Sequence, residues 1–433
     1  MKKTALCYLG AALAMSSPII ALAGGPDHAQ PVPFGHGYAG FNTGIDTTGI
    51  NYQRLNRLTG NLESQYKDES LQGWSGGLYT GYEFNLSRRY FADFEGFYRW
   101  TGSTFNFSDS QSAANNYGYK KSMETGLSLL PGIHLNKASL YARIGWTMAR
   151  FTRNASATAR TNSGIEFNHH YSGMQTGLGY RTHLFNKFFL QADYIYSYYS
   201  KRESKDGGGD GTVFYRSFSN SYLVGLMYQF GHQTQQYAHQ AALKLKGLYT
   251  GMQFISNMTR IETHADRPGA ADENWDHLIR GVKLGLNVGY SYLCKKNFYL
   301  AAEASTQFIT NQFEEIGNNY KLKDGMRYGL SLLPGYRLND SNLVFARLGW
   351  ELAKFKRTGT VAVASNLGPN FNKYLNGFRV GLGYETALTH RLSLNAEYDY
   401  TLYEKFANSQ GTGRFNYTPQ SSQFLIGLAY RFH

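Results

Sequence analysis

The sequence predicts an all-β protein made of two tandem eight-stranded antiparallel β-barrels that cross a membrane. Apolar and polar side chains alternate along many segments, the chain repeats itself after about 200 residues, and short connections alternate with long polar ones. An aromatic content of 16% is too high for a disordered chain. No apolar run of about 18 residues follows the N-terminal segment, which excludes a bundle of transmembrane helices.

Residues 1–23 are predicted to form a secretory signal peptide. Lys2 and Lys3 precede an apolar stretch that ends in Ala21-Leu22-Ala23, which is the order of regions in such peptides. Cleavage after Ala23 removes 2 of the 43 basic residues, so 41 remain against 30 acidic ones and the net charge becomes +11. Cys294 is then the remaining cysteine, and no internal disulfide is expected.

Four sequence blocks occur twice in the same order, which indicates a tandem duplication. The longest ungapped identity is Gly-Leu-Ser-Leu-Leu-Pro-Gly, at 126–132 and again at 329–335. The other pairs of blocks are Ala142–Trp146 with Ala346–Trp350, Gly177–Tyr180 with Gly381–Tyr384, and Leu223–Phe230 with Leu425–Phe432. We therefore expect a first barrel over 34–232, a periplasmic linker over 233–246 and a second barrel over 247–433.

Within each half the side chains alternate with a period of two, which indicates strands. Between Tyr90 and Trp100 the even positions are aromatic or small, whereas Asp93, Glu95 and Arg99 occupy odd positions. The second half shows the same alternation. The eight strands expected in the first half start near Tyr38, Trp74, Tyr90, Met123, Leu140, Met174, Phe188 and Phe214.

The connections between these strands alternate in length. The short ones are Leu86–Arg89, Pro131–Lys137 and Leu184–Lys187, and the long polar ones are Thr47–Gln72, Gly102–Ser122, Thr152–Asn168 and Lys201–Thr212. Pro131-Gly132 and Pro334-Gly335 suit the central positions of type II turns. Short turns at one end and long loops at the other are typical of outer-membrane barrels in bacteria.

The apolar face is predicted to point towards lipid and the polar face into the barrel. Eight strands leave a lumen barely wide enough for side chains, and it cannot hold all the aromatic residues of the apolar face. Leu190, Tyr194, Leu394 and Tyr398 are therefore expected to face hydrocarbon. Glycine on the polar face makes room for long charged residues, which should pair and fill the lumen. The expected ionic network comprises Asp93, Glu95, Arg99, Glu124, Arg143, Arg181, Asp193, Glu303, Arg327, Arg347, Glu351, Glu385, Glu397 and Asp399.

Each half resembles the eight-stranded outer-membrane barrels of the opacity-type surface proteins and the OmpA transmembrane domain. The resemblance lies in the repeated Gly-Leu-Gly-Tyr block, the inward acidic and basic pattern, and the alternating closing strands that end at Phe230 and Phe432. It implies a location in the bacterial outer membrane, contact with its lipid and lipopolysaccharide, and insertion by the barrel-assembly machinery through the C-terminal strand. His433 after Phe432 departs from the aromatic end of the family.

Two classes of function are compatible with this sequence. One is a surface protein, an adhesin or surface antigen, whose long extracellular loops contact host surfaces, other cells or lipopolysaccharide. The other is a porin-like channel for small polar solutes, formed by one sixteen-stranded barrel. The linker favours two barrels, because Gly231–Lys246 is much longer than the short turns. The loop stretches expected to bind are Asn56–Leu71, Ser108–Lys121, Asn154–His170, Arg202–Thr212, Asp266–His277, Glu314–Lys323, Thr358–Asn372 and Ala407–Thr418.

A lipid A-modifying enzyme is the weaker alternative. Enzymes of this kind use Ser, His and acidic residues at the outer rim, where His169, His170, Ser172 and Glu166 are predicted to lie. The equivalent stretch 372–374 of the second half lacks these residue types. We therefore expect no catalytic residue, no cofactor and no metal. Nucleic-acid binding is not expected either, because the sequence has no basic helix or recognition motif.

Overall fold

The computed structural model describes residues 35–56, 62–87, 89–109, 117–135, 138–155, 167–205, 211–231, 245–266, 273–294, 297–315, 320–359, 369–410 and 413–432. The predicted signal peptide and nearly all of the predicted linker lie outside these ranges. The described strands of the first half are β1 (His36–Asn56), β2 (Leu62–Asn85), β3 (Tyr90–Asp109), β4 (Tyr117–Leu135), β5 (Ala138–Ala155), β6 (Phe167–Phe185), β7 (Phe188–Tyr199), β8 (Arg202–Lys205) and β9 (Gly211–Gln229).

The second half repeats this order of strands. Its described strands are β10 (Gly247–Asp266), β11 (Glu273–Cys294), β12 (Phe298–Phe308), β13 (Asn311–Glu315), β14 (Tyr320–Asn339), β15 (Asn342–Thr358), β16 (Phe371–Ala387), β17 (Leu392–Tyr403), β18 (Phe406–Gln410) and β19 (Gly413–Arg431). The short strands β8, β13 and β18 continue β7, β12 and β17 along the same neighbouring strand.

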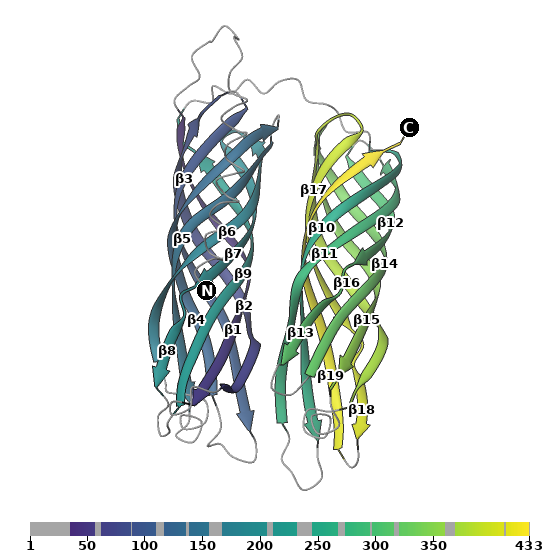
Figure 1. Cartoon of the computed structure of the whole chain (residues 1–433). Helices are drawn as coiled ribbons and strands as arrows, with labels where there is room; N and C mark the ends of the chain where they lie inside the picture. The colour runs from purple at the N-terminus through teal and green to yellow at the C-terminus, as the bar shows by residue number, and fades with distance from the viewer. Residues whose placement is uncertain are drawn as a thin grey trace.

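Each half closes on itself as an eight-stranded antiparallel ring. In the first half each strand from β1 to β6 pairs with the next, β7 pairs with β9, and β1 closes the ring by pairing with β9. In the second half β10 closes the ring by pairing with β19. The prediction of two tandem barrels is therefore confirmed, and the sixteen-stranded alternative is wrong. Figure 1 shows the two barrels side by side.

The strands are much longer than a membrane crossing requires. β1 has 21 residues and β2 has 24, whereas about 9–11 residues span a bilayer as a tilted strand. Twenty residues extend over roughly 65 Å at about 3.3 Å per residue. Much of the predicted loop Thr47–Gln72 is therefore strand, because β1 continues to Asn56 and β2 resumes at Leu62. We call the end with the short turns the turn end, and the other end the rim end.

The predicted turns at Pro131-Gly132 and Pro334-Gly335 are wrong. Both pairs lie inside strands, with Gly132 opposite Phe91 on β3 and Gly335 opposite Tyr299 on β12. The Phe91 ring lies where a Cβ on Gly132 would be. Glycine is thus needed here for the close approach of an aromatic ring and not for a turn.

The two faces of the strands alternate as predicted, with one difference. Outward side chains such as Phe94 and Leu129 are about half exposed to the surroundings of the barrel. Many aromatic side chains, however, point inward and are buried, which contradicts the expectation that they all face lipid. The inward rings of Tyr38, Tyr79 and Tyr141 each lie over a glycine of the neighbouring strand. Glycine on the inner face therefore makes room for rings as well as for charged groups.

Part of the outer wall is covered, which the sequence pattern did not predict. Leu394 and Ala396 on β17 are only 6% and 8% exposed, although their inward neighbour Asn395 shows that they point out of the barrel. Leu190, Tyr194 and Tyr398 on the equivalent outer faces are partly buried. These residues pack in clusters that contain side chains of both barrels. The expectation that they face hydrocarbon is wrong because the other barrel takes the place of lipid.

Candidate functional site: the charged barrel interiors

The centre of the first barrel holds an arginine between two carboxylates, and we call this group the middle layer. Arg143 on β5 donates from Nη1 to Oε1 of Glu95 at 2.7 Å, and its Nη2 lies 3.3 Å from Oδ1 of Asp193. The phenols of Tyr38 and Tyr141 donate to the same two carboxylates. All three charged side chains are at most 2% exposed. Strand alternation places them on one inner surface, where charges must pair because water is scarce.

The turn-end layer of the first barrel is built around Arg181 on β6. Its guanidinium contacts Oε2 of Glu83 at 3.1 Å and Oδ2 of Asp93 at 2.9 Å. The same guanidinium stacks over the Tyr38 ring, 4.8 Å from the centroid. Arginine suits this position because its planar guanidinium can bridge two carboxylates and stack on an aromatic ring at the same time.

The rim-end layer of the first barrel contains two cations and two carboxylates. Lys121 lies 2.8 Å from Oδ2 of Asp46 and 3.1 Å from Oε2 of Glu124, and Glu124 also contacts Arg99 at 3.3 Å. Hydroxyl groups complete the hydrogen bonds of both carboxylates. The donors are Thr147, Ser197 and Tyr199 to Glu124, and Thr48, Ser103 and Ser221 to Asp46.

The middle layer recurs in the second barrel. Arg347 pairs with Glu303 at 2.8 Å and with Glu397, and Asp399 lies 3.8 Å away. Tyr249 donates to Glu303 at 3.0 Å, as its counterpart Tyr38 does to Glu95. An arginine between two carboxylates is therefore common to the interiors of both repeats.

The two outer layers of the second barrel carry the opposite pattern of signs. At the rim end, Asp324 and Arg327 stand where the first barrel has Lys121 and Glu124. Asp324 pairs with Arg327 at 2.6 Å and with Lys283 at 3.2 Å, and Arg327 pairs with Glu351 at 3.0 Å. Arg379, which also belongs to this region, pairs with Asp399 and lies 3.5 Å from Glu351.

At the turn end of the second barrel the inversion is repeated. Glu385 stands where the first barrel has Arg181, and it pairs at 3.0 Å with Arg431, which replaces Gln229. Ser393 also donates to Glu385. The signs of the charges thus change between the barrels, whereas the pairing is preserved in each layer. This pattern is what a requirement that every interior charge be paired would leave, since a role in selecting one sign of ion would hold the signs fixed.

All fourteen side chains of the expected network are buried and make an ion pair inside their own barrel. Sequence reasoning missed several partners. The missed residues are Asp46, Glu83, Lys121, Lys283, Asp324, Arg379 and Arg431. Lys121 and Glu124 are three residues apart, so strict alternation puts them on opposite faces, but a register shift between Lys121 and Met123 turns both inward. An equivalent shift lies between Asp324 and Arg327 in the second barrel. Both halves thus carry two charged residues three positions apart at this point, and this shared spacing was the signal in the sequence that could have revealed them.

Beyond the ionic layers, aromatic clusters fill the interior towards the rim. In the first barrel Phe151 packs edge-on against Tyr171 and Tyr199, with ring centroids 5.3 and 5.1 Å apart. In the second barrel Phe371 and Tyr417 lie 5.2 Å apart within a larger buried cluster. The described part of the lumen is therefore filled by the three ionic layers and the rings that pack between them, and by further aromatic rings beyond the last ionic layer towards the rim end.

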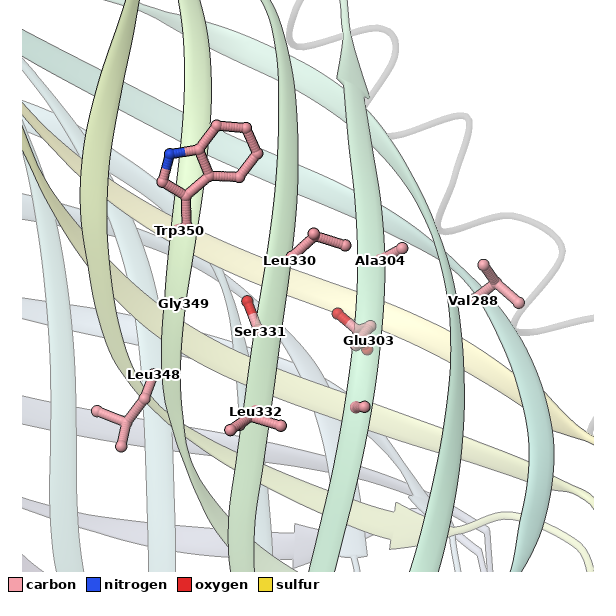
Figure 2. Close-up of a pocket in the computed structure, with 10 residues that line it drawn as sticks. Val288, Glu303, Ala304, Leu330, Ser331, Leu332, Leu348, Gly349 and Trp350 are labelled. Carbon is pink, nitrogen blue, oxygen red and sulfur yellow. The ribbon is translucent and has the colours of Figure 1, made fainter.

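A cavity of about 620 Å³ lies on the outer wall of the second barrel and not in its lumen. Figure 2 shows its lining on β11, β12, β14 and β15, with Leu330, Leu332, Leu348 and Trp350 near the small residues Ala304 and Gly349. The four large residues are 42–59% exposed, as expected of side chains on a lipid-facing wall. The groove is thus a feature of the membrane surface.

The residues of the weaker enzyme hypothesis lie apart from any charged cluster. His169, His170 and Ser172 are exposed on β6 near the rim, and Glu166 falls outside the described residues. Among the described residues, no group of three His, Cys, Asp or Glu side chains is placed to hold a metal ion. The described part of the chain also contains no helix that is long and apolar enough to cross a membrane.

Closed rings of long strands, an apolar outer wall and a paired ionic interior define a transmembrane β-barrel protein. The chain belongs to the family of the outer membrane protein beta-barrel domain, whose model matches residues 9–230 and again residues 233–432. Its place is therefore the outer membrane of a bacterium. Among curated proteins, none matches the sequence.

The chain shows distant similarity to solved structures, among them the following three. The attachment invasion locus protein Ail of Yersinia pestis is 16% identical over 43% of this chain and 99% of its own, with a TM-score of 0.24. Neisserial surface protein A is 17% identical over 41% of this chain and 97% of its own, with a TM-score of 0.23. The toluene transporter TodX of P. putida is 12% identical over 93% of this chain and 91% of its own, with a TM-score of 0.28.

Proposed function

We propose that this protein is a surface-exposed interaction protein, adhesin-like or antigen-like, in which two filled barrels carry binding segments at their rim ends. The observation that carries the proposal is the filled lumen: paired ions and packed rings leave the rim as the large solvated surface available to a ligand. The partners would be molecules of host or neighbouring cell surfaces. The proposal assigns no catalytic step and no cofactor.

The length of the strands supports this role. Strands of about 20 residues exceed the span of the bilayer by roughly a factor of two, so the barrels extend well beyond the membrane on the rim side. The segments that join strands there are 57–61, 110–116, 156–166, 206–210, 267–272, 316–319, 360–368 and 411–412. Each of the eight predicted binding stretches contains one of these segments, which lie outside the described residues, together with the adjoining strand ends.

A set of outward basic residues supports contact with lipopolysaccharide. Lys323 on β14 lies directly opposite Lys356 on β15, and Lys354 lies over the Tyr374 ring at 5.4 Å. Two like charges in direct cross-strand register repel each other, and an anionic phosphate between them would remove that cost. Lys120 and Arg150 occupy the equivalent positions of Lys323 and Lys354 in the first barrel. We further propose that the closing strand β19, which has Tyr430 next to its last residue and is followed directly by Phe432, is recognised by the barrel-assembly machinery.

The test combines two measurements on the full-length protein. The rim segments would be replaced by Gly/Ser segments of equal length, and the matched control would replace the turn-end segment 86–89 in the same way. We expect the rim variant to stay folded, as judged by heat-modifiable migration, and to lose attachment of expressing bacteria to cultured epithelial cells, whereas the control keeps it. Planar bilayers should show no stable conductance. Stable ion-conducting steps from the intact protein, with attachment unaffected by rim replacement, would overturn the proposal in favour of a channel.

A further inference from the structure

The contact between the two barrels obeys an internal twofold relation. Tyr180 on β6 packs against its own counterpart of the repeat, Tyr384 on β16, with ring centroids 5.6 Å apart. Tyr222 on β9 likewise meets its counterpart Phe424 on β19 at 5.7 Å. Residues that meet their own equivalents lie close to a twofold axis, which is the property of an isologous interface.

The contacts away from this axis are reciprocal. Tyr194 of the first barrel lies 6.4 Å from Phe424 of the second, and the equivalent pair with the halves exchanged, Tyr222 with Tyr398, lies 6.2 Å apart. β2 and β11, which are equivalent strands, also both take part. Gln72 on β2 donates to Ser422 at 3.3 Å, and Arg280, the counterpart of Gln72 on β11, lies over Phe218 at 3.1 Å from the ring centroid.

Polar side chains on this face distinguish it from the other outer walls. Tyr222 and Ser256 share a hydrogen bond of 2.8 Å between the barrels, as do Thr182 and the Tyr384 hydroxyl. Asn220 accepts from Tyr194 at 2.9 Å within the same contact. These outward hydroxyl and amide groups would face hydrocarbon if the barrels separated, and lipid offers them no partner. The opposite walls present Leu127, Leu129, Leu330 and Leu332 instead.

We propose that this face is a self-complementary interaction surface, through which the two halves form a fixed intrachain pair in the membrane without lipid between them. Its occupant is the equivalent face of the other half, because each side supplies the aromatic and polar groups that the other side needs. The pair is thus the fused equivalent of a twofold homodimer. It holds the two rims at one constant separation, independently of the residues that link the halves.

The experiment measures the distance between the barrels in full-length protein in lipid vesicles. Spin labels would be attached at Arg89→Cys and Asp340→Cys, two exposed turn-end positions on different barrels, in a Cys294→Ser background. Electron double resonance should give one narrow distance distribution. Tyr180→Ala with Tyr222→Ala should broaden it severalfold, whereas the matched lipid-facing pair Phe94→Ala with Tyr98→Ala should leave it narrow.

Three outcomes would overturn the proposal. One is a broad distribution in the otherwise unsubstituted protein, and another is no response to the two tyrosine substitutions while heat-modifiable migration shows intact barrels. The third is loss of the narrow distance on dilution with unlabelled protein, because this would show that the face pairs between two chains and not within one.

Discussion

The rim-end ionic layer of the first barrel offers the sharpest test of the interior, through the substitution Lys121→Met. Lys121 is fully buried and pairs with Asp46 at 2.8 Å and Glu124 at 3.1 Å. Methionine keeps most of the side-chain volume but removes the charge. Removing one partner of a buried pair costs about 3–5 kcal/mol, because a carboxylate is left without its counter-charge. We expect a loss of this size in the free energy of unfolding.

Two further variants separate the charge effect from a general sensitivity of β4. Lys120 is the adjacent residue and is exposed on the outer face, so Lys120→Met should change the free energy of unfolding by no more than about 0.5 kcal/mol. Adding Asp46→Asn to Lys121→Met removes a carboxylate that lost its partner and should recover about 1–3 kcal/mol. The second barrel already has Asn257 at this position, where it donates to Asp324 at 2.8 Å.

The assay is urea unfolding of the full-length protein in phosphatidylcholine vesicles, followed by tryptophan fluorescence and by heat-modifiable migration. Lys121→Met should be the least stable of the three variants, and the double variant should lie between it and the unsubstituted protein. Equal stability of Lys121→Met and Lys120→Met would refute the view that the interior charges are held by mutual compensation.

Two other predictions concern glycine and the lipid-facing wall. Gly179→Ala should destabilise the first barrel by about 1–3 kcal/mol, because a Cβ at this position meets the Tyr141 ring. The control Gly96→Ala should be nearly neutral, because the nearest atom to its Cβ lies 3.5 Å away. Equal urea midpoints of the two variants would show that the Tyr141 ring moves aside freely. Leu129→Arg on the lipid-facing wall should lower the free energy of unfolding by roughly 2–4 kcal/mol if residue 129 lies near the midplane, and Leu86→Arg at the turn end should lower it by about 0–1 kcal/mol. A larger loss for Leu86→Arg than for Leu129→Arg in vesicles would contradict the assignment of faces.

The sequence by itself determined the class of protein, because two signals do not depend on distant contacts. A period of two fixes which side chains share a face of a strand, and the repeated blocks show that the pattern occurs twice. Together they predicted two barrels and placed Glu95, Arg143 and Asp193 inside the first. The alternation along these strands was enough to assign the two faces. Lipid outside the barrel requires apolar side chains and the narrow lumen accepts polar ones, so alternate residues differ in character.

Local irregularity limited the prediction of the ionic layers. Lys121 was assigned to a loop, and Asp324 was not among the expected interior residues. The register shifts in β4 and β14 that turn these two side chains inward leave no mark in simple alternation. The turns predicted at Pro131-Gly132 and Pro334-Gly335 failed for a related reason. A glycine that relieves a clash with a ring across the sheet has the same sequence signature as one that permits a positive φ.

Only the tertiary structure decided what covers each outer face. Leu190 and Leu394 were predicted to face lipid. The alternation shows that an apolar side chain points outward, but it does not distinguish lipid from another protein wall as the contacting surface. The arrangement of the barrels places both residues in the clusters between them, where Leu394 is only 6% exposed. Contacts of this kind join residues about 200 positions apart and arise from packing, which no local period encodes.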